Sequence, residues 1–556
     1  MSAIDVATND APPQAGRKEW VGLAVLALAC LLYVMDLTVL HLAVPEISED
    51  LHPTSTELLW IIDVYGFMVA GALVVMGTLG DRIGRRKLLM IGAVCFGLTS
   101  ILAAFSNSAE MLIVSRALLG LSGATIAPST LSLIFHMFPD PKQRGIAIAW
   151  WIAAFSAGSV VGPVVGGAML ELFWWGSVFL LALPVMAALL ILGPRVLPEY
   201  KDPNAGRLDV LSAAMSVVAV LGIVYGIKEI AAHGYSDTAN ASITVGLLVG
   251  VAWAYRQQRL ENPMIDVSLF TVRSFNSALT VNFFAIFMMV GYFIFVFQYL
   301  QLVLGLSPLE AGLWGLPGAA GFVVTSQMTP RLAHRFTPPQ LVGTGLAVAA
   351  LGLYVLIGVS ADNGDRGLTI AVLGSVIISL GMGPVFGLTT ELIVGSAPPE
   401  KAGAASGISE TAAELGGALG IAIFGSVGVT MYRNGLDELP AGVPPEAAAD
   451  ARDTLGGAVA AAADLPANLA YALLDIAEHA FVDGMRLSTA IAAVLATFVA
   501  GFAFVGLKPA AQAAVEHGHL VPPSEPGESG ESRETEPVSP APAVAEGDLS
   551  QTKVNV

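Results

Sequence analysis

The sequence predicts an all-α integral membrane protein. Hydrophobic residues make up 55% of its 556 residues and charged residues only 13%, whereas a soluble domain carries about 25% charged residues. Apolar runs long enough to cross a bilayer recur along the chain. The net charge of -18 argues against nucleic acid as a partner. Only Cys30 and Cys95 are present, so we expect neither a disulfide framework nor a metal site.

Fourteen apolar runs have the length of a membrane span. The first begins near Trp20 and contains Asp36, and at about 25 residues it is too long for the core of a cleaved signal peptide. We therefore expect spanning helices over residues 20–44, 58–79, 88–107, 110–136, 144–170, 175–194, 209–230, 240–255, 275–304, 309–332, 338–359, 367–394, 402–431 and 485–507.

The distribution of Lys and Arg predicts the orientation of these spans. With a cytoplasmic N-terminus, most basic residues fall in inner loops, including the run at 82–87. The outer loops then hold only Arg366, Arg433 and Arg452. Because short loops rich in Lys and Arg stay in the cytoplasm, we expect both termini on that side.

Two polar segments interrupt or follow the apolar runs. Residues 508–556 are rich in Pro, Glu, Ser and Ala, and predict a disordered cytoplasmic tail. Residues 432–484 form an outer loop with apolar residues at near-helical spacing. We expect a short helical hairpin over the outer mouth, built on Leu469, Leu473, Ile476 and Phe481.

Three ionisable side chains lie inside the first four predicted spans. Asp36 is about 24 Å from the start of span 1 at helical rise, and Arg116 is about two turns inside span 4. Asp63 lies near the outer end of span 2. Such groups are costly in a membrane and indicate a functional site. We expect a cluster in which protonation of Asp36 releases Arg116; a static pair that fixes packing is the alternative.

Three glutamates occupy late spans. Glu391 lies in span 12, and Glu410 and Glu414 lie four residues apart in span 13, on one helix face. Adjacent buried carboxylates suit a proton carrier or a site for a cationic substrate. The alternative for them is a hydrated position at the inner mouth.

Aromatic and amide side chains near span ends form a further candidate site. Trp60, Tyr65, Tyr292 and Gln298 could line a cavity for flat or cationic molecules. Anchoring at the membrane interface is the alternative for the aromatic ones.

Two glycine-containing segments predict close backbone contacts. Residues 77–87 read GTLGDRIGRRK, whose charges end a span and whose glycines allow a tight turn. In span 5, Gly158, Gly162 and Gly166 recur every four residues beside Gly167 and form a smooth ridge. Pro163 removes a backbone hydrogen bond there and permits a kink.

Together these segments resemble the fourteen-span drug:proton antiporter family of the major facilitator superfamily, of the type that exports quaternary ammonium compounds and multiple drugs. The resemblance covers roughly residues 20–430 and the last span. The segments that support this resemblance are GTLGDRIGRRK, VSRALLGLSG around Arg116, GSVVGPVVGGAML in span 5 and DLTVLHLAVP beginning at Asp36. It implies that Arg116 and Asp36 couple transport to protons.

The resemblance also implies a domain organisation. Two six-helix bundles would occupy residues 20–200 and 271–507, the second including the outer loop 432–484. The spans of residues 201–270 would be inserted between them, with a cytoplasmic segment at 1–19 and the tail at 508–556.

The function implied is proton-coupled efflux of lipophilic, cationic compounds across the plasma membrane by alternating access, without a cofactor and without enzymatic activity. We expect a monomer whose partners are small molecules, protons and the bilayer. The candidate gate residues are Gly77, Gly80, Asp81, Arg82, Gly84, Arg85 and Arg86. Export of one endogenous metabolite or antibiotic is an alternative, and a membrane sensor that does not transport is another.

Overall fold

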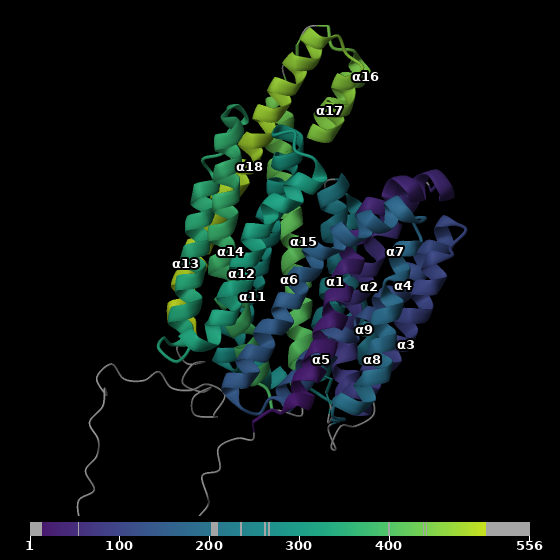
Figure 1. Ribbon diagram of the computed structural model, residues 1–556, viewed down its shortest axis with the longest axis vertical. Helices are drawn as coiled ribbons and strands as arrows, with labels where there is room; N and C mark the ends of the chain where they lie inside the picture. The colour runs from purple at the N-terminus through teal and green to yellow at the C-terminus, as the bar shows by residue number, and fades with distance from the viewer. Residues whose placement is uncertain are drawn as a thin grey trace, which may run out of the picture.

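The computed structural model describes residues 14–53, 55–201, 209–233, 236–260, 263–264, 267–398, 401–437, 439–440 and 442–507. Across these residues the regular structure is helical, and long helices run side by side (Figure 1). The predicted tail 508–556 and most of the N-terminal segment 1–19 lie outside the described residues.

The first half of the chain forms eight helices. Their bounds are α1 Arg17–Leu51, α2 Ser55–Ile83, α3 Arg85–Ala104, α4 Ala109–Gly123, α5 Ile126–Met137, α6 Pro141–Leu172, α7 Ser177–Leu180 and α8 Ala182–Val196. Two predicted spans are therefore each divided in two. Pro128 has no N–H for the carbonyl of Ala124, and Pro184 has none for that of Leu180, so the helix is interrupted at both places.

The second half continues with longer helices. They are α9 Val210–His233, α10 Asp237–Gln257, α11 Arg273–Gln298, α12 Pro308–Leu332, α13 Pro338–Leu356, α14 Gly364–Gly395, α15 Ala402–Gly435, α16 Pro445–Asp453, α17 Leu455–Ala463 and α18 Ala467–Gly506. Short 3₁₀ turns lie at Val267–Thr271 and Ala361–Asn363, and a π-helical segment, Tyr299–Val303, extends α11.

Among the described residues, twelve stretches are long and apolar enough to cross a membrane. Two further long helices, α6 and α12, lie among them in Figure 1 and pack against each other. The expected count of fourteen is compatible with this arrangement.

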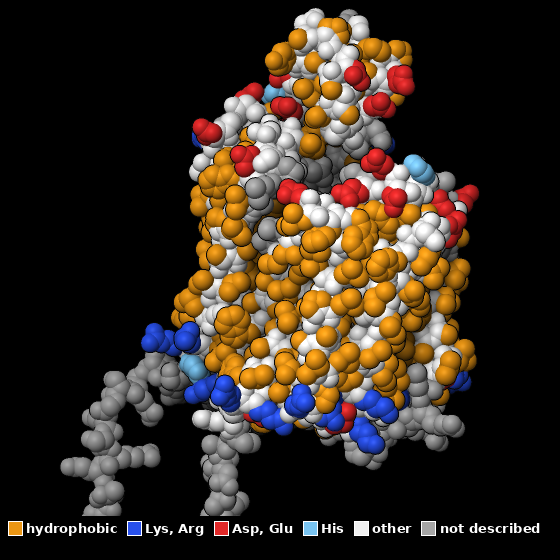
Figure 2. All heavy atoms as spheres, turned by 45° about the vertical axis from the view of Figure 1, so that its right-hand side comes forward, with side chains coloured by type: hydrophobic (Ala, Val, Ile, Leu, Met, Phe, Trp, Pro, Cys, Tyr) orange, Lys and Arg blue, Asp and Glu red, His pale blue; other side chains and the backbone are white. Residues whose placement is uncertain are grey.

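The helices form two groups that meet along α2, α6, α12 and α15. Helices α1 to α8 pack together, and α11 to α15 pack with α18 (Figure 1). Figure 2 shows a broad hydrophobic belt, with Lys and Arg at one end of the molecule and Asp and Glu at the other. We name these the basic end and the acidic end. The described chain begins at the basic end, where the Ala15 N–H donates to Gln143 Oε1 at 2.7 Å, at the start of α6.

The inserted helices α9 and α10 pack on each other through small residues. A Cβ on Gly222 would lie 3.0 Å from the Ser242 carbonyl oxygen, and one on Gly226 would lie 2.7 Å from that of Ala239. Helix α9 also contacts both α2 and α15. It therefore covers one seam between the two groups of helices.

The outer segment differs from the expected hairpin. Residues 467–484 are not a separate element but the first part of α18, which is one helix of 40 residues. Helix α17 packs beside this extension and α16 packs on α17, and both stand away from the bundle at the acidic end (Figure 1). Buried Leu473 and Ala477 explain the helical spacing, because this face of α18 packs in the core.

Candidate functional site

The structure brings Asp36 of α1 and Arg116 of α4 together. Arg116 is fully buried, and its Nη1 lies 2.6 Å from Asp36 Oδ2. Its Nε donates to the Ile61 carbonyl at 3.2 Å. A buried guanidinium is tolerated only when its charge and its donors are satisfied. The backbone of α2 and the carboxylate of α1 together meet that requirement.

The ring of Tyr65 packs against the guanidinium of Arg116. The Arg116 guanidinium carbon lies 4.8 Å from the centre of the Tyr65 ring and 5.9 Å from that of Phe179. The Tyr65 hydroxyl donates to the Tyr33 carbonyl at 3.3 Å. Asp63, the third member of the predicted cluster, follows Ile62, whose carbonyl is 3.5 Å from Arg116 Nη2. A direct contact of Asp63 with the pair stays a prediction.

Glu410 and Glu414 of α15 are half-buried, and α15 packs against α2 and α5 of the first group of helices. Tyr33 of α1 is buried in that group beside Tyr65, with ring centres 6.2 Å apart. The sequence analysis missed Tyr33. Its position three residues before Asp36, on the same face of α1, was the signal that could have revealed it.

Glu391 does not join this network. It is buried on α14 at the basic end, where its Oε1 lies 3.8 Å from Arg144 Nε of α6. Arg144 in turn lies over the Phe135 ring, 5.1 Å from its centre. Glu391 is thus part of an ion pair between the two groups of helices and is set apart from Glu410 and Glu414.

The four aromatic and amide candidates do not form one cavity lining. Trp60 stacks on Tyr225 of α9, with ring centres 6.1 Å apart, because the inserted helix covers that face of α2. Gln298 is exposed at the end of α11, next to the π-helical segment. Tyr65 lies beneath Arg116, and Tyr292 is buried in the second group of helices.

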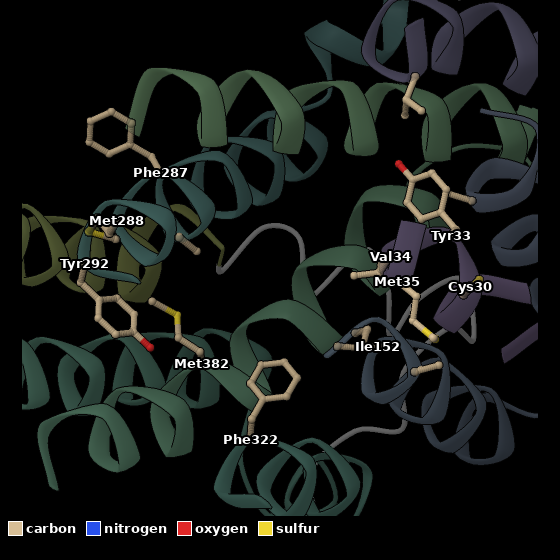
Figure 3. Close-up of a cluster of buried hydrophobic side chains, with 14 of the residues drawn as sticks. Cys30, Tyr33, Val34, Met35, Ile152, Phe287, Met288, Tyr292, Phe322 and Met382 are labelled. Atoms are coloured by element: carbon tan, nitrogen blue, oxygen red, sulfur yellow. The ribbon is translucent and has the colours of Figure 1, made fainter. Parts of the chain in front are cut away.

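Figure 3 shows two sets of buried side chains, and Tyr292 belongs to one of them. Phe287, Met288 and Tyr292 come from α11, with Phe322 and Met382 from α12 and α14. Cys30, Tyr33, Val34 and Met35 come from α1, with Ile152 from α6. The two sets lie on different sides of the view, so Tyr292 belongs to the second group and not to the Arg116 site.

The segment 77–87 joins the two groups at the basic end. Buried Arg85 pairs with Asp81, and Asp81 Oδ2 accepts a hydrogen bond from the Ala404 N–H of α15 at 3.2 Å. A Cβ on Gly77 would lie 2.5 Å from the Gly403 carbonyl oxygen. The start of α15 can approach α2 this closely because position 77 is glycine, and Gly403 leaves room for the Arg85 guanidinium of α3.

The remaining gate candidates hold the turn between α2 and α3. Gly84 has φ of +112°, which favours glycine. Arg86 lies 3.5 Å from a Glu199 carboxylate oxygen and donates to the Leu197 carbonyl at 3.0 Å. Arg82 Nη1 lies 3.5 Å from the Thr78 carbonyl, and a Cβ on Gly80 would lie 2.7 Å from Arg85.

The glycine ridge of α6 packs against α1. A Cβ on Gly158 would lie 2.6 Å from the Leu31 carbonyl oxygen, and one on Gly166 would lie 2.7 Å from Val39. Gly162 is buried, whereas a Cβ on Gly167 would meet nothing within 4 Å. The backbone at Pro163 lies within the unbroken helix α6, and its side chain is outside the described residues.

These contacts define a class of protein. Two groups of apolar helices are joined at one end by glycines and ion pairs, and the first group encloses a buried carboxylate–guanidinium pair. This arrangement is typical of a multi-pass membrane transporter. Within the described residues, no group of three or more His, Cys, Asp or Glu side chains could hold a metal ion.

The chain belongs to the Major Facilitator Superfamily, whose sequence profile matches residues 26–421. It is 46% identical over 492 residues to the multidrug efflux pump LfrA of Mycolicibacterium smegmatis, covering 88% of this chain and 96% of that protein. It is 38% identical over 475 residues to the methyl viologen resistance protein SmvA of Salmonella typhimurium, covering 84% and 93%. The tetracenomycin C resistance and export protein of Streptomyces glaucescens is 30% identical, covering 87% and 91%.

Solved structures support the same fold. The human organic anion transporter MFSD10 aligns with a TM-score of 0.56 at 15% identity, covering 86% of this chain and 99% of that one. A bacterial homologue of the lysosomal transporter Spinster aligns with a TM-score of 0.52 at 18% identity, covering 89% and 98%. The chain is therefore a multi-pass membrane protein of the major facilitator fold.

Proposed function

We propose that this protein exports lipophilic, cationic small molecules in exchange for protons. Relatives that align over most of their length are named for multidrug efflux and for resistance to methyl viologen, and methyl viologen is an organic cation. The observation that carries the coupling to protons is the buried pair of Asp36 and Arg116. An ionisable pair of this kind inside a membrane-spanning bundle is costly and marks a proton or ion pathway.

In this proposal Asp36 and Arg116 form the proton switch. Protonation of Asp36 removes the negative charge that faces Arg116 Nη1 at 2.6 Å and leaves the guanidinium without its counter-ion. Tyr65, beneath Arg116, belongs to α2, and α2 packs against α15. A change at the pair is thus transmitted through α2 to the second group of helices, where Glu410 and Glu414 bind either a proton or the cationic substrate.

The gate at the basic end is the second part of the proposal. Asp81 connects Arg85 of α3 with the first turn of α15, and Glu391 connects with Arg144. Both links join one group of helices to the other, so opening at this end requires that both break. In this proposal the basic end is closed while both links are formed, as they are in the described conformation.

The same reasoning extends to topology and energy source. The basic end faces the cytoplasm, because Lys and Arg concentrate there, and both termini lie on that side of the plasma membrane. The protein acts as a monomer. The proton gradient drives transport without a cofactor, and the protein catalyses no covalent reaction.

Transport by the purified protein in liposomes tests the proposal. With an imposed pH gradient, we expect uptake of ethidium or methyl viologen into vesicles that are acidic inside, and collapse of that uptake when a protonophore is added. Transport confined to one neutral natural product would favour a dedicated exporter. Absence of pH-gradient-dependent flux for monovalent cations, divalent cations and neutral drugs would favour a sensor and contradict the proposal.

A further inference from the structure

A cleft at the basic end follows the seam between α6, α12 and α14, opposite the helices that flank Asp81. Its cavity volume is about 40 Å³, and it is partly open to the surroundings. Ala149 of α6 and Leu388 of α14 line its wall, and Pro330 of α12 faces Gly145 across it. Each group of helices therefore contributes one side of the cleft.

Basic side chains stand on both sides of the cleft. Lys142, at the start of α6, and His334, just after α12, belong to its lining. Arg331 and Arg335 are exposed beside His334. Glu391 also lines the cleft, where it pairs with Arg144, and Asp140 accepts the Lys142 N–H as the cap of α6. The rim of the cleft, with Lys142, His334, Arg331 and Arg335, is thus suited to an anion.

A buried hydroxyl also faces this space. Ser326 lines the cleft and is 1% exposed, yet its Oγ has no hydrogen-bond partner among the described residues. A buried hydroxyl without a partner is costly. A ligand with an ester or phosphate oxygen would remove that cost.

Exposed apolar side chains are next in sequence to two lining residues, Ala149 and Thr329. Trp150 follows Ala149 on α6 and is 50% exposed, and Met328 of α12 is 44% exposed. In a membrane protein such side chains face lipid. The cleft therefore combines a basic rim with edges that contact acyl chains.

We infer that this cleft binds an anionic phospholipid from the leaflet at the basic end. The lipid phosphate lies between Lys142 of one group of helices and His334 of the other, and an acyl chain follows Trp150 and Met328. Clefts of this kind between membrane helices, with a basic rim, bind anionic headgroups. The lipid contacts both groups at once, so it stabilises the closed basic end. The inference requires only that the protein lies in a membrane and does not depend on proton coupling.

Lipid binding to the full purified chain tests the inference. In detergent, we expect short-chain phosphatidylglycerol to raise the thermal unfolding temperature more than phosphatidylcholine of the same chain length. Lys142→Gln should weaken the apparent affinity for phosphatidylglycerol about fivefold, since one basic group near the headgroup contributes about 1 kcal/mol. His334→Gln should lower the affinity further when combined with it.

Lys87→Gln is the matched control, because Lys87 is exposed at the same end on α3, away from the cleft. It should leave the affinity within about twofold of the original. Equal losses in the Lys87 and Lys142 variants would show nonspecific attraction and overturn the inference. So would equal stabilisation by the two lipids, or the same effect from free glycerol phosphate. Gly145→Val, which narrows the cleft without changing charge, should also weaken binding while the variant stays monodisperse and helical.

Discussion

The burial of Arg116 imposes a strong condition on its surroundings. With no exposed surface, its charge is balanced by Asp36 and its remaining donors meet the α2 backbone. Removing one partner of such a pair costs about 3–5 kcal/mol, because the other charge is left buried alone. The site is therefore sensitive to any event that neutralises Asp36, and protonation is the smallest such event.

Asp36→Asn removes the titratable group while keeping the side chain's size. We expect pH-gradient-driven efflux to fall at least about tenfold, because the pair can no longer respond to protons. The unfolding temperature should also fall, because Arg116 loses its counter-ion. Transport in liposomes, with size-exclusion chromatography to verify folding, measures both. Unchanged efflux by a folded variant would contradict the role of Asp36.

Two substitutions of Tyr65 separate the contribution of its hydroxyl from that of its ring. Tyr65→Phe keeps the ring face beneath Arg116 and removes only the hydrogen bond to Tyr33, so we expect transport within about threefold of the original. Tyr65→Leu removes the cation–π contact, worth about 1–2 kcal/mol when desolvated. It should shift the pH at which transport is half-maximal. Identical pH profiles for the two variants would show that the ring does not position Arg116.

For single residues, the sequence predicts which buried charges form a pair better than it predicts which side chains line a cavity. Asp36 and Arg116 could be foreseen because a lone charge in an apolar helix needs a partner at similar depth. Trp60 and Gln298 could not be placed, since their surroundings depend on α9 and on the π-helical end of α11. The pairing of Glu391 with Arg144 could not be foreseen, because the two residues lie on helices far apart in the sequence.

At the scale of helices, contact between α2 and α15 depends on two glycines. A Cβ on Gly403 would collide with the Arg85 guanidinium. Gly403→Ala should therefore hold the basic end open and lower transport. Accessibility of a cysteine introduced at the basic end to a soluble thiol reagent would reveal the opening. Gly425→Ala on the same helix is the control, because its Cβ would meet nothing within 4 Å. Equal transport and equal thiol accessibility in the two variants would contradict a role of Gly403 in closing the basic end.

The inserted helices are fastened by a polar cluster at the basic end. Asp209 accepts a hydrogen bond from Ser212 at 2.7 Å and pairs with Arg256 at 2.7 Å. The Ser212 hydroxyl and then Arg256 hold the pKa of the Asp209 carboxyl below its usual value of 3.8. A lowered pKa means that the contribution to stability is present above about pH 4 and is lost as the pH falls through the lowered value.

Asp209→Asn should therefore lower the unfolding temperature at pH 7 by a small amount, corresponding to about 1 kcal/mol or less. The difference from the original protein should shrink below about pH 4. Thermal unfolding of both proteins across this pH range measures it. A difference that is constant with pH would show that the carboxylate charge plays no part.

Helix boundaries were predictable to the extent that local chemistry sets them. The divisions between α4 and α5 and between α7 and α8 follow from Pro128 and Pro184, which were visible in the sequence but not used. The union of residues 467–484 with the last span was not predictable, because a polar stretch can continue a helix or end it. Packing of α17 against the extension favours continuation. Hydrogen bonds from the side chains of Tyr432 and Arg452 to the carbonyls of Ala451 and Leu436 join α16 to the end of α15.

At the scale of the whole molecule, alternation between two open ends requires the groups of helices to separate at the basic end. Gly145 and Pro330 provide a test, because a Cβ on Gly145 would lie 3.6 Å from Pro330 Cβ. That separation suits a disulfide. Gly145→Cys with Pro330→Cys should lose transport when oxidised and regain it with reductant, whereas each single variant should be unaffected by oxidant. Full transport by the cross-linked protein would show that this end does not open.

The overall arrangement was largely predictable from the sequence. Hydropathy gives the helices, and the Lys and Arg pattern matches the basic end of Figure 2. The position of α9 against both α2 and α15 was not predictable, because its apolar faces do not reveal which helix is the partner. The choice of partner helix depends on small-residue contacts such as Gly222 with Ser242, which only the assembled structure shows.

The long helix α18 has a practical consequence. Its 40 residues correspond to about 60 Å of rise, about twice the hydrocarbon thickness of a bilayer. The excess projects from the acidic end as a stiff rod supported by α16 and α17. Most of a transporter of this size lies hidden within lipid or detergent, which leaves little to align in electron micrographs. An antibody fragment bound to the rod would provide a rigid external marker. The orientation of that fragment would report the tilt of the second group of helices directly.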